Sequence, residues 1–156
     1  MTARLAALAT VALAVALAGC GASSGTRIPE LRRLPLVEGA GVVAQSRVCD
    51  RGASAYCAIE LVVVDSRYAT STALVSAERA QLRRHGWTGA SGDTGDERAA
   101  DSPGGKLRVT YATAYGELKG IDFLWIKRSR ATARALSHAM FARAPAMSIL
   151  LEPGAS

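Results

Sequence analysis

The fold is decided by the stretch Tyr56-Cys57-Ala58-Ile59-Glu60-Leu61-Val62-Val63-Val64. When this stretch is extended, apolar side chains stand on both of its sides: Cys57, Ile59, Leu61 and Val63 on one, and Ala58, Val62 and Val64 on the other. A short apolar run with two apolar sides is typical of a strand that is covered on both faces of a sheet. The sequence therefore predicts that residues 56–64 form a buried central strand.

A helix is expected next in the chain, from a cap at Ser71 or Thr72 to His85. Four of its residues recur at helical spacing: Leu74, Val75, Glu78 and Leu82. Gly86 is suited to end this helix, because glycine adopts the left-handed conformation found just beyond many helices. The polar residues 88–106 have no periodicity, so they predict a long loop.

Three strands and a second helix are expected in the rest of the chain. They are a half-buried strand over 107–112, a turn over 116–120, a two-sided apolar strand over 121–126, a helix over 130–143 capped by Ser129, and a closing strand over 147–151. Before the central strand, residues 42–48 predict a strand and residues 50–54 a turn, which together form a hairpin with 56–64.

From residue 56 onward the expected order is strand, helix, strand, strand, helix, strand. This order resembles the ferredoxin-like split βαβ pattern. That fold has its first and third strands in the middle of the sheet, and here these are 56–64 and 121–126, the two strands with apolar residues on both sides. We expect an α+β domain over 28–156, with an antiparallel sheet, two helices and an additional N-terminal hairpin strand.

The first residues have the layout of a secretory signal peptide. Arg4 is followed by a run from Leu5 to Ala18 in which only Thr10 is not apolar. One cation, a short apolar core and then small residues are typical of such signals. As a helix this run would be about 21 Å long, which is short of the roughly 30 Å hydrocarbon core of a bilayer.

The end of this run, Leu17-Ala18-Gly19-Cys20, resembles the lipobox of bacterial lipoproteins. The resemblance implies that residues 1–19 are removed and that Cys20 receives lipid. Two or more acyl chains anchor a protein stably in a membrane. The small, polar residues 20–27 would then be a flexible tether. An extracytoplasmic protein on the cell membrane is expected from these features.

Cys49 and Cys57 remain after lipid is assigned to Cys20. An even pair in an oxidising compartment is typical of a disulfide. No further Cys or His lies near the pair in sequence to complete a metal site, and the C-x-x-C spacing of reactive dithiols is absent. We predict a structural disulfide that closes the N-terminal hairpin, with no metal and no cofactor.

The charge of the chain does not indicate a nucleic-acid-binding protein. The formal net charge is +6, or +5 once Arg4 is removed with the signal, and the basic residues are scattered with few aromatic residues between them. One basic group stands out at the start of the second expected helix: Lys127, Arg128, Arg130 and Arg134. Cations there oppose the helix dipole, so this group could contact an anion or a lipid headgroup; the alternative is a solvated surface.

These features predict a membrane-anchored accessory or interaction module of the cell envelope, with an envelope protein or polymer as its partner. Two alternatives remain open. One is a carrier of small molecules or lipids in a cleft between sheet and helix, and the other is a cell-wall hydrolase. The H-E-x-x-H and S-x-x-K motifs are absent, so we expect a protein without enzymatic activity.

The lipid anchor can be tested by changing Cys20→Ala in the full chain. Only a thiol can accept the lipid, so the variant should lose labelling by a palmitate analogue and either stay unprocessed or leave the membrane fraction. Labelling and fractionation of the producing cells measure both effects. Undiminished lipid labelling of the variant would refute the anchor.

Overall fold

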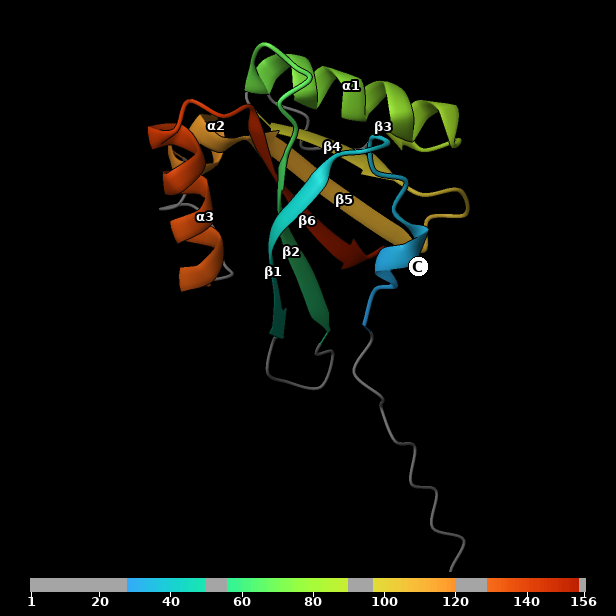
Figure 1. Ribbon diagram of the computed structural model, residues 1–156. Helices are drawn as coiled ribbons and strands as arrows, with labels where there is room; N and C mark the ends of the chain where they lie inside the picture. The colour runs from blue at the N-terminus through green and yellow to red at the C-terminus, as the bar shows by residue number, and fades with distance from the viewer. Residues whose placement is uncertain (1–27, 50–55, 90–96, 120–128, 155–156) are drawn as a thin grey trace, which may run out of the picture.

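The computed structural model describes residues 28–49, 56–89, 97–119 and 129–154. These residues form an α+β fold with a six-stranded antiparallel sheet in the order β1-β2-β6-β5-β4-β3 (Figure 1). The strands are β1 (Gly41–Cys49), β2 (Cys57–Val64), β3 (Thr88–Gly89), β4 (Glu97–Asp101), β5 (Leu107–Thr113) and β6 (Ala146–Pro153). The helical elements are a 3₁₀ turn η1 (Leu31–Arg33), α1 (Ser71–Arg84), α2 (Ala114–Lys119) and α3 (Arg130–Phe141).

The expected central strand is confirmed. β2 pairs with β1 on one side and β6 on the other, and all of its residues except Val64 are buried. Its side chains alternate between two clusters. Ile59, Leu61 and Val63 belong to the larger core with α1, β5 and β6, whereas Val62 packs with residues of α2 and α3. The two longer helices therefore cover opposite faces of the sheet.

The N-terminal strap (residues 28–40) covers part of the larger core. Pro29, Leu34 and Val37 are buried, and Leu31 and Leu36 pack against the cluster that contains Leu74 and Leu82 of α1. No regular element apart from η1 forms here, because Pro29 and Pro35 each remove a backbone donor. The strap leads directly into β1.

Both long helices end and begin close to where the sequence predicts. Thr70, one residue before the expected cap, accepts a hydrogen bond from the Ala73 amide at 3.1 Å. After α1, Gly86 has a φ of 77°, and the Trp87 amide donates to the Leu82 carbonyl, so the indole folds back onto the core. The expected Ser129 cap of α3 is confirmed by its hydrogen bond from the Thr132 amide.

Two of the expected irregular segments contain regular structure. The predicted loop over 88–106 includes β3 and β4, and β4 is paired with β5 along its full length. Ala99 and Ala100 are buried there; small side chains of this kind give a weak periodic signal. The predicted turn over 116–120 overlaps α2, whose start is held by a hydrogen bond from the Gly116 amide to Thr113 Oγ1.

The ferredoxin-like strand order is wrong for the described strands. In that order the closing strand lies at an edge, but β6 lies between β2 and β5 and pairs with both. The physical reason is its burial: Ala146 to Ile149 and Leu151 are buried, so β6 is itself covered on both faces. The expected strand over 121–126 lies outside the described residues.

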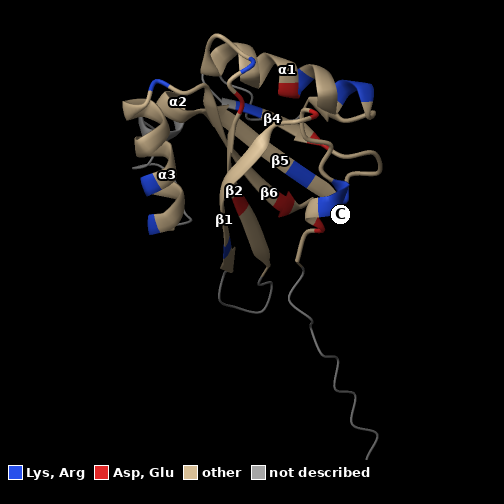
Figure 2. Ribbon diagram, in the orientation of Figure 1, with Lys and Arg blue, Asp and Glu red and all other residues tan. Residues whose placement is uncertain are grey.

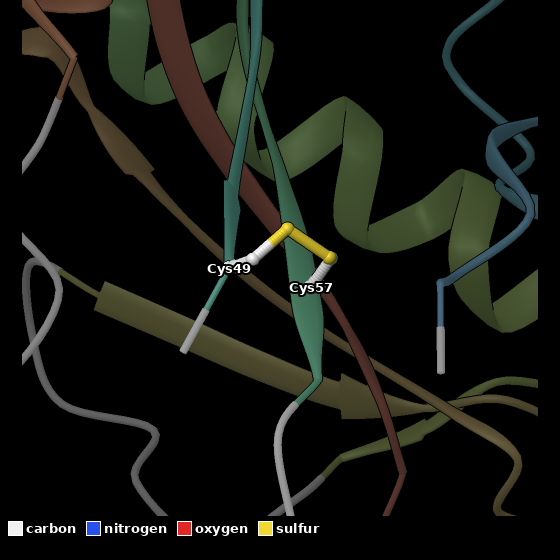
Figure 3. Close-up of a disulfide and its surroundings, with 2 residues drawn as sticks. All are labelled: Cys49 and Cys57. Atoms are coloured by element: carbon white, nitrogen blue, oxygen red, sulfur yellow. A yellow bond between two sulfur atoms is a disulfide. The ribbon is translucent and has the colours of Figure 1, made fainter. Parts of the chain in front are cut away.

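The predicted disulfide is confirmed. Cys49 at the end of β1 and Cys57 at the start of β2 are directly opposite in the ladder and are joined by a bond between their sulfur atoms (Figure 3). The bond closes the hairpin at the end where the two strands connect. It therefore holds the end of β1, which pairs with β2 alone among the described strands, in register with the central strand.

Replacing both cysteines, Cys49→Ala and Cys57→Ala, should lower the free energy of unfolding by about 2–3 kcal/mol, because the bond restrains a loop of eight residues in the unfolded chain. Denaturant unfolding of the full chain measures this loss. A reductant should destabilise the wild-type protein by a similar amount and leave the variant unchanged. Equal stability of the two proteins, or free thiols in non-reduced peptides, would contradict the prediction.

Candidate functional site

A buried carboxylate in β2 fixes the position of α3. Glu60 is 1% exposed, and its Oε2 atom accepts hydrogen bonds from Ser46 Oγ at 2.8 Å and Thr132 Oγ1 at 3.0 Å. The amide of Ser129, the N-cap of α3, also donates to Oε2 at 3.4 Å. A carboxylate is favourable at this end of a helix, where the amides and the dipole are positive. Glu60 thus ties the first turn of α3 to both β1 and β2.

The hydrogen bonds of Glu60 hold α3 beside β1, and an apolar groove runs between the two elements. Its volume is about 700 Å³. The walls are made mainly of small side chains, among them Val43 and Ala44 from β1 and Ala131 and Ala135 from α3. Small residues on both walls keep the helix from filling the space above the strand. The groove is therefore a consequence of the sequence of α3 as much as of its position.

β1 lies at one end of the sheet order and pairs, within the part of the chain that the structure describes, with β2 alone. Its ladder is irregular between Val42 and Ala44, and Val43 is 53% exposed at this bulge. The backbone donors and acceptors on the outer side of an edge strand can pair with another extended chain. A nine-residue edge strand and an apolar groove thus lie side by side.

The groove is bordered by cations. Arg134 and His138, one turn apart on α3, line it, and none of the described residues that line it is acidic. α3 has basic side chains and no acidic ones (Figure 2). Of the four residues expected to contact an anion, Arg130 and Arg134 are exposed on α3, whereas Lys127 and Arg128 lie outside the described residues. Contact of this basic group with an external anion stays a prediction; Glu60 already supplies a negative charge at the start of α3.

A second buried carboxylate holds the N-terminal strap. Glu78 of α1 is fully buried, and its Oε2 atom accepts a hydrogen bond from the Val37 amide at 2.9 Å. Its Oε1 atom is without a hydrogen-bond partner among the described residues. Burial raises the pKa of Glu78 to about 7, although the bond from Val37 acts in the opposite direction. The strap is held a second time where Arg67 donates to the carbonyl of Glu38.

Two tyrosines and one ion pair lie outside the groove. Tyr111 is buried in the larger core and Tyr115 is exposed. Asp101 pairs with Arg108 of the neighbouring strand at 2.9 Å, and this guanidinium lowers the pKa of Asp101. Cys20 lies outside the described residues. Across the described segments we find no group of three or more His, Cys, Asp or Glu side chains suited to hold a metal ion, and no helix long and apolar enough to cross a membrane.

The role of Glu60 was not predicted from the sequence. Its signal was present, because it is the single charged residue inside the most apolar strand, and buried charges are rare unless they are paired or hydrogen-bonded. The hydrogen-bond partners of Glu60 on α3 had no comparable signal in the sequence. Ser46 lies opposite Glu60 in the hairpin of β1 and β2, whereas Ser129 and Thr132 are far from Glu60 in sequence and only the packing of α3 brings them to it.

No protein-family model matches the chain, and neither the search of curated proteins nor that of solved structures finds a match.

Glu78→Gln should remove a pH dependence of stability. In the folded wild-type protein the raised pKa favours the protonated form of Glu78. The stabilising contribution of this protonated side chain is therefore complete below about pH 4.5 and is lost as pH rises through about 7. Between about pH 5 and pH 8 the wild type should lose roughly 2–3 kcal/mol relative to the variant. Denaturant unfolding at both pH values measures the difference. The exposed Glu38→Gln is the matched control; a wild type and a Glu78→Gln variant with parallel pH profiles would contradict the assignment.

Proposed function

We propose that this chain is a lipid-anchored extracytoplasmic protein whose domain docks an extended acidic segment of an envelope protein along β1. The observation that carries this proposal is the edge strand β1 beside the apolar groove. The proposed function is binding alone, and the bound segment is not chemically changed. It refines the broader expectation of an interaction module by naming the surface and the kind of partner.

The proposed location rests on two features. The first is the signal-like N-terminal segment that ends in Leu17-Ala18-Gly19-Cys20. The second is the Cys49–Cys57 bond, since disulfides persist mainly in oxidising compartments. The bond alone is weak support, because it serves a structural role in the hairpin. The Cys20→Ala experiment is therefore the direct test of the location.

An extended polypeptide is the occupant that fits this surface best. The outer side of β1 offers alternating amide and carbonyl groups, which only another extended backbone can match along the strand. Side chains on one face of such an added strand would enter the groove against Ala44 and Ala135. The groove is lined by small apolar residues, so it fits small or branched apolar side chains.

The charge around the groove favours acidic residues in the partner. Arg134 and His138 are on the α3 side, and Arg47 is exposed further along β1. Complementary charge steers association and fixes the register of a bound segment more than it adds affinity. Cations on an edge strand also oppose pairing with a second copy of the same strand, because like charges repel there.

The test uses the full chain in detergent micelles with two synthetic probe peptides of about ten residues. One peptide alternates Asp or Glu with Val or Ala; the other has Lys at the acidic positions. Added strands protect backbone amides, so the acidic peptide should slow hydrogen exchange in β1 but not in β3. Val43→Glu and Arg134→Glu should each reduce the affinity for the acidic peptide about tenfold or more, as fluorescence anisotropy measures.

The matched control is Arg83→Glu, which reverses a charge on α1 away from the groove and should leave the affinity unchanged. The proposal fails if neither peptide protects β1. It also fails if a fluorescent fatty acid saturates the groove while the peptides do not bind, since that outcome identifies the domain as a lipid carrier.

A further inference from the structure

A basic surface lies where the N-terminal strap meets the end of α1. η1 carries Arg32 and Arg33, and Arg84 and His85 follow at the end of α1; all four residues are exposed. The two segments flank a hollow of about 440 Å³, and Arg32, Arg33 and His85 line it. Figure 2 shows the basic residues of η1 and of the end of α1 on the same side of the domain. We call these four residues the basic end.

The basic end has an excess of positive charge. Arg32 pairs with Glu30 at 3.1 Å, whereas Arg33 has no ion-pair partner among the described residues. Arg84 donates to the side-chain oxygen of Gln81, which is a neutral group. None of the described residues that line the hollow is acidic. The single carboxylate of Glu30 therefore leaves the charges of Arg33 and Arg84 exposed to solvent.

The dipole of α1 explains only part of this arrangement. A cation in the last turn of a helix is favourable, which accounts for Arg84. η1 has only three residues and no comparable dipole, yet two of them are exposed arginines. In the adjoining strands, the carboxylates Asp101 and Glu152 interact with Arg108. The arginines of η1 are therefore available to a negative charge outside the domain.

The basic end adjoins the point where the chain enters the described domain. Ile28, the first described residue, is 46% exposed and lies just before η1. If lipid is attached to Cys20, only residues 20–27 separate the anchor from Ile28. A segment of this length spans at most about 29 Å when fully extended. It contains Arg27 and no Asp or Glu. A short connection without negative side chains would therefore hold the basic end close to the bilayer.

We propose that the basic end lies against anionic phospholipid headgroups of the membrane, with Ile28 at the interface. This inference rests on the lipid anchor proposed above and assigns the face that the anchored domain turns toward the bilayer. An anionic leaflet is an extended field of charge, so a local excess of cations is sufficient, and each cation near it strengthens adsorption about fivefold. The strap and α1 cover one face of the sheet and α3 the other, so this contact leaves the groove beside α3 uncovered.

The experiment uses the protein as processed by the producing cells, mixed with two kinds of vesicle. One kind is phosphatidylcholine alone, and the other is an equal mixture of phosphatidylcholine and phosphatidylglycerol. With the anionic vesicles, hydrogen exchange over residues 28–36 and at the end of α1 should be about threefold slower or more than with the neutral ones, because bound headgroups oppose local opening. Exchange in β1 should be equal in both. Salt at about 1 M shortens the Debye length to about 3 Å and should remove the difference.

Arg33→Glu should reduce this difference at least about twofold, because it reverses an exposed charge of the basic end. Arg143→Glu is the matched control: it reverses an exposed charge just beyond α3 and should behave as the wild type does. The salt dependence of the wild-type protein keeps the proposal testable even if Arg33→Glu does not fold.

Flotation of the same samples separates the surface contact from the anchor. Protein that floats with both kinds of vesicle and shows equal exchange over residues 28–36 keeps the anchor and overturns the role of the basic end. Protein that floats with the anionic vesicles alone supports the basic end and contradicts the anchor, and protein that floats with neither overturns both. Slower exchange confined to α3 would also overturn the proposal, because it identifies the group around Arg130 as the membrane contact.

Discussion

The need to cover β2 on both faces governs the arrangement of the whole domain. Its side chains alternate between two clusters, so other elements must supply apolar side chains on both faces of the same strand. α1 and the N-terminal strap meet this need on one face, and α2 and α3 meet it on the other. Because Glu60 is the polar exception within this strand, the second face is also joined to α3 by hydrogen bonds, which are directional, in addition to apolar contacts. The position of the groove beside β1 follows from that fixed attachment.

The sequence predicted the elements with strong local signals: the two-sided strand 56–64, the Ser129 cap, the glycine after α1 and the disulfide. It missed β4, because Ala99 and Ala100 are too small to produce a clear alternation. The strand order failed for a different reason. It assigned a central place to 121–126 and an edge to the closing strand, but β6 is buried on both faces and lies between β2 and β5. The groove joins β1 and α3, which are far apart in sequence, so no local pattern indicated it.

The disulfide has a mechanical consequence for a chain that is held from its N-terminal end. A pull on the residues before Ile28 enters the domain through the strap, where the Val37–Glu78 hydrogen bond and the apolar contacts of Leu34 resist first. Beyond the strap the load would separate β1 from β2, pair by pair from Gly41 toward Cys49. At Cys49 the covalent bond transfers the load to Cys57, at the start of the best-buried strand of the sheet. Tension can therefore peel the edge strand only as far as this bond, and the five remaining strands stay assembled behind it.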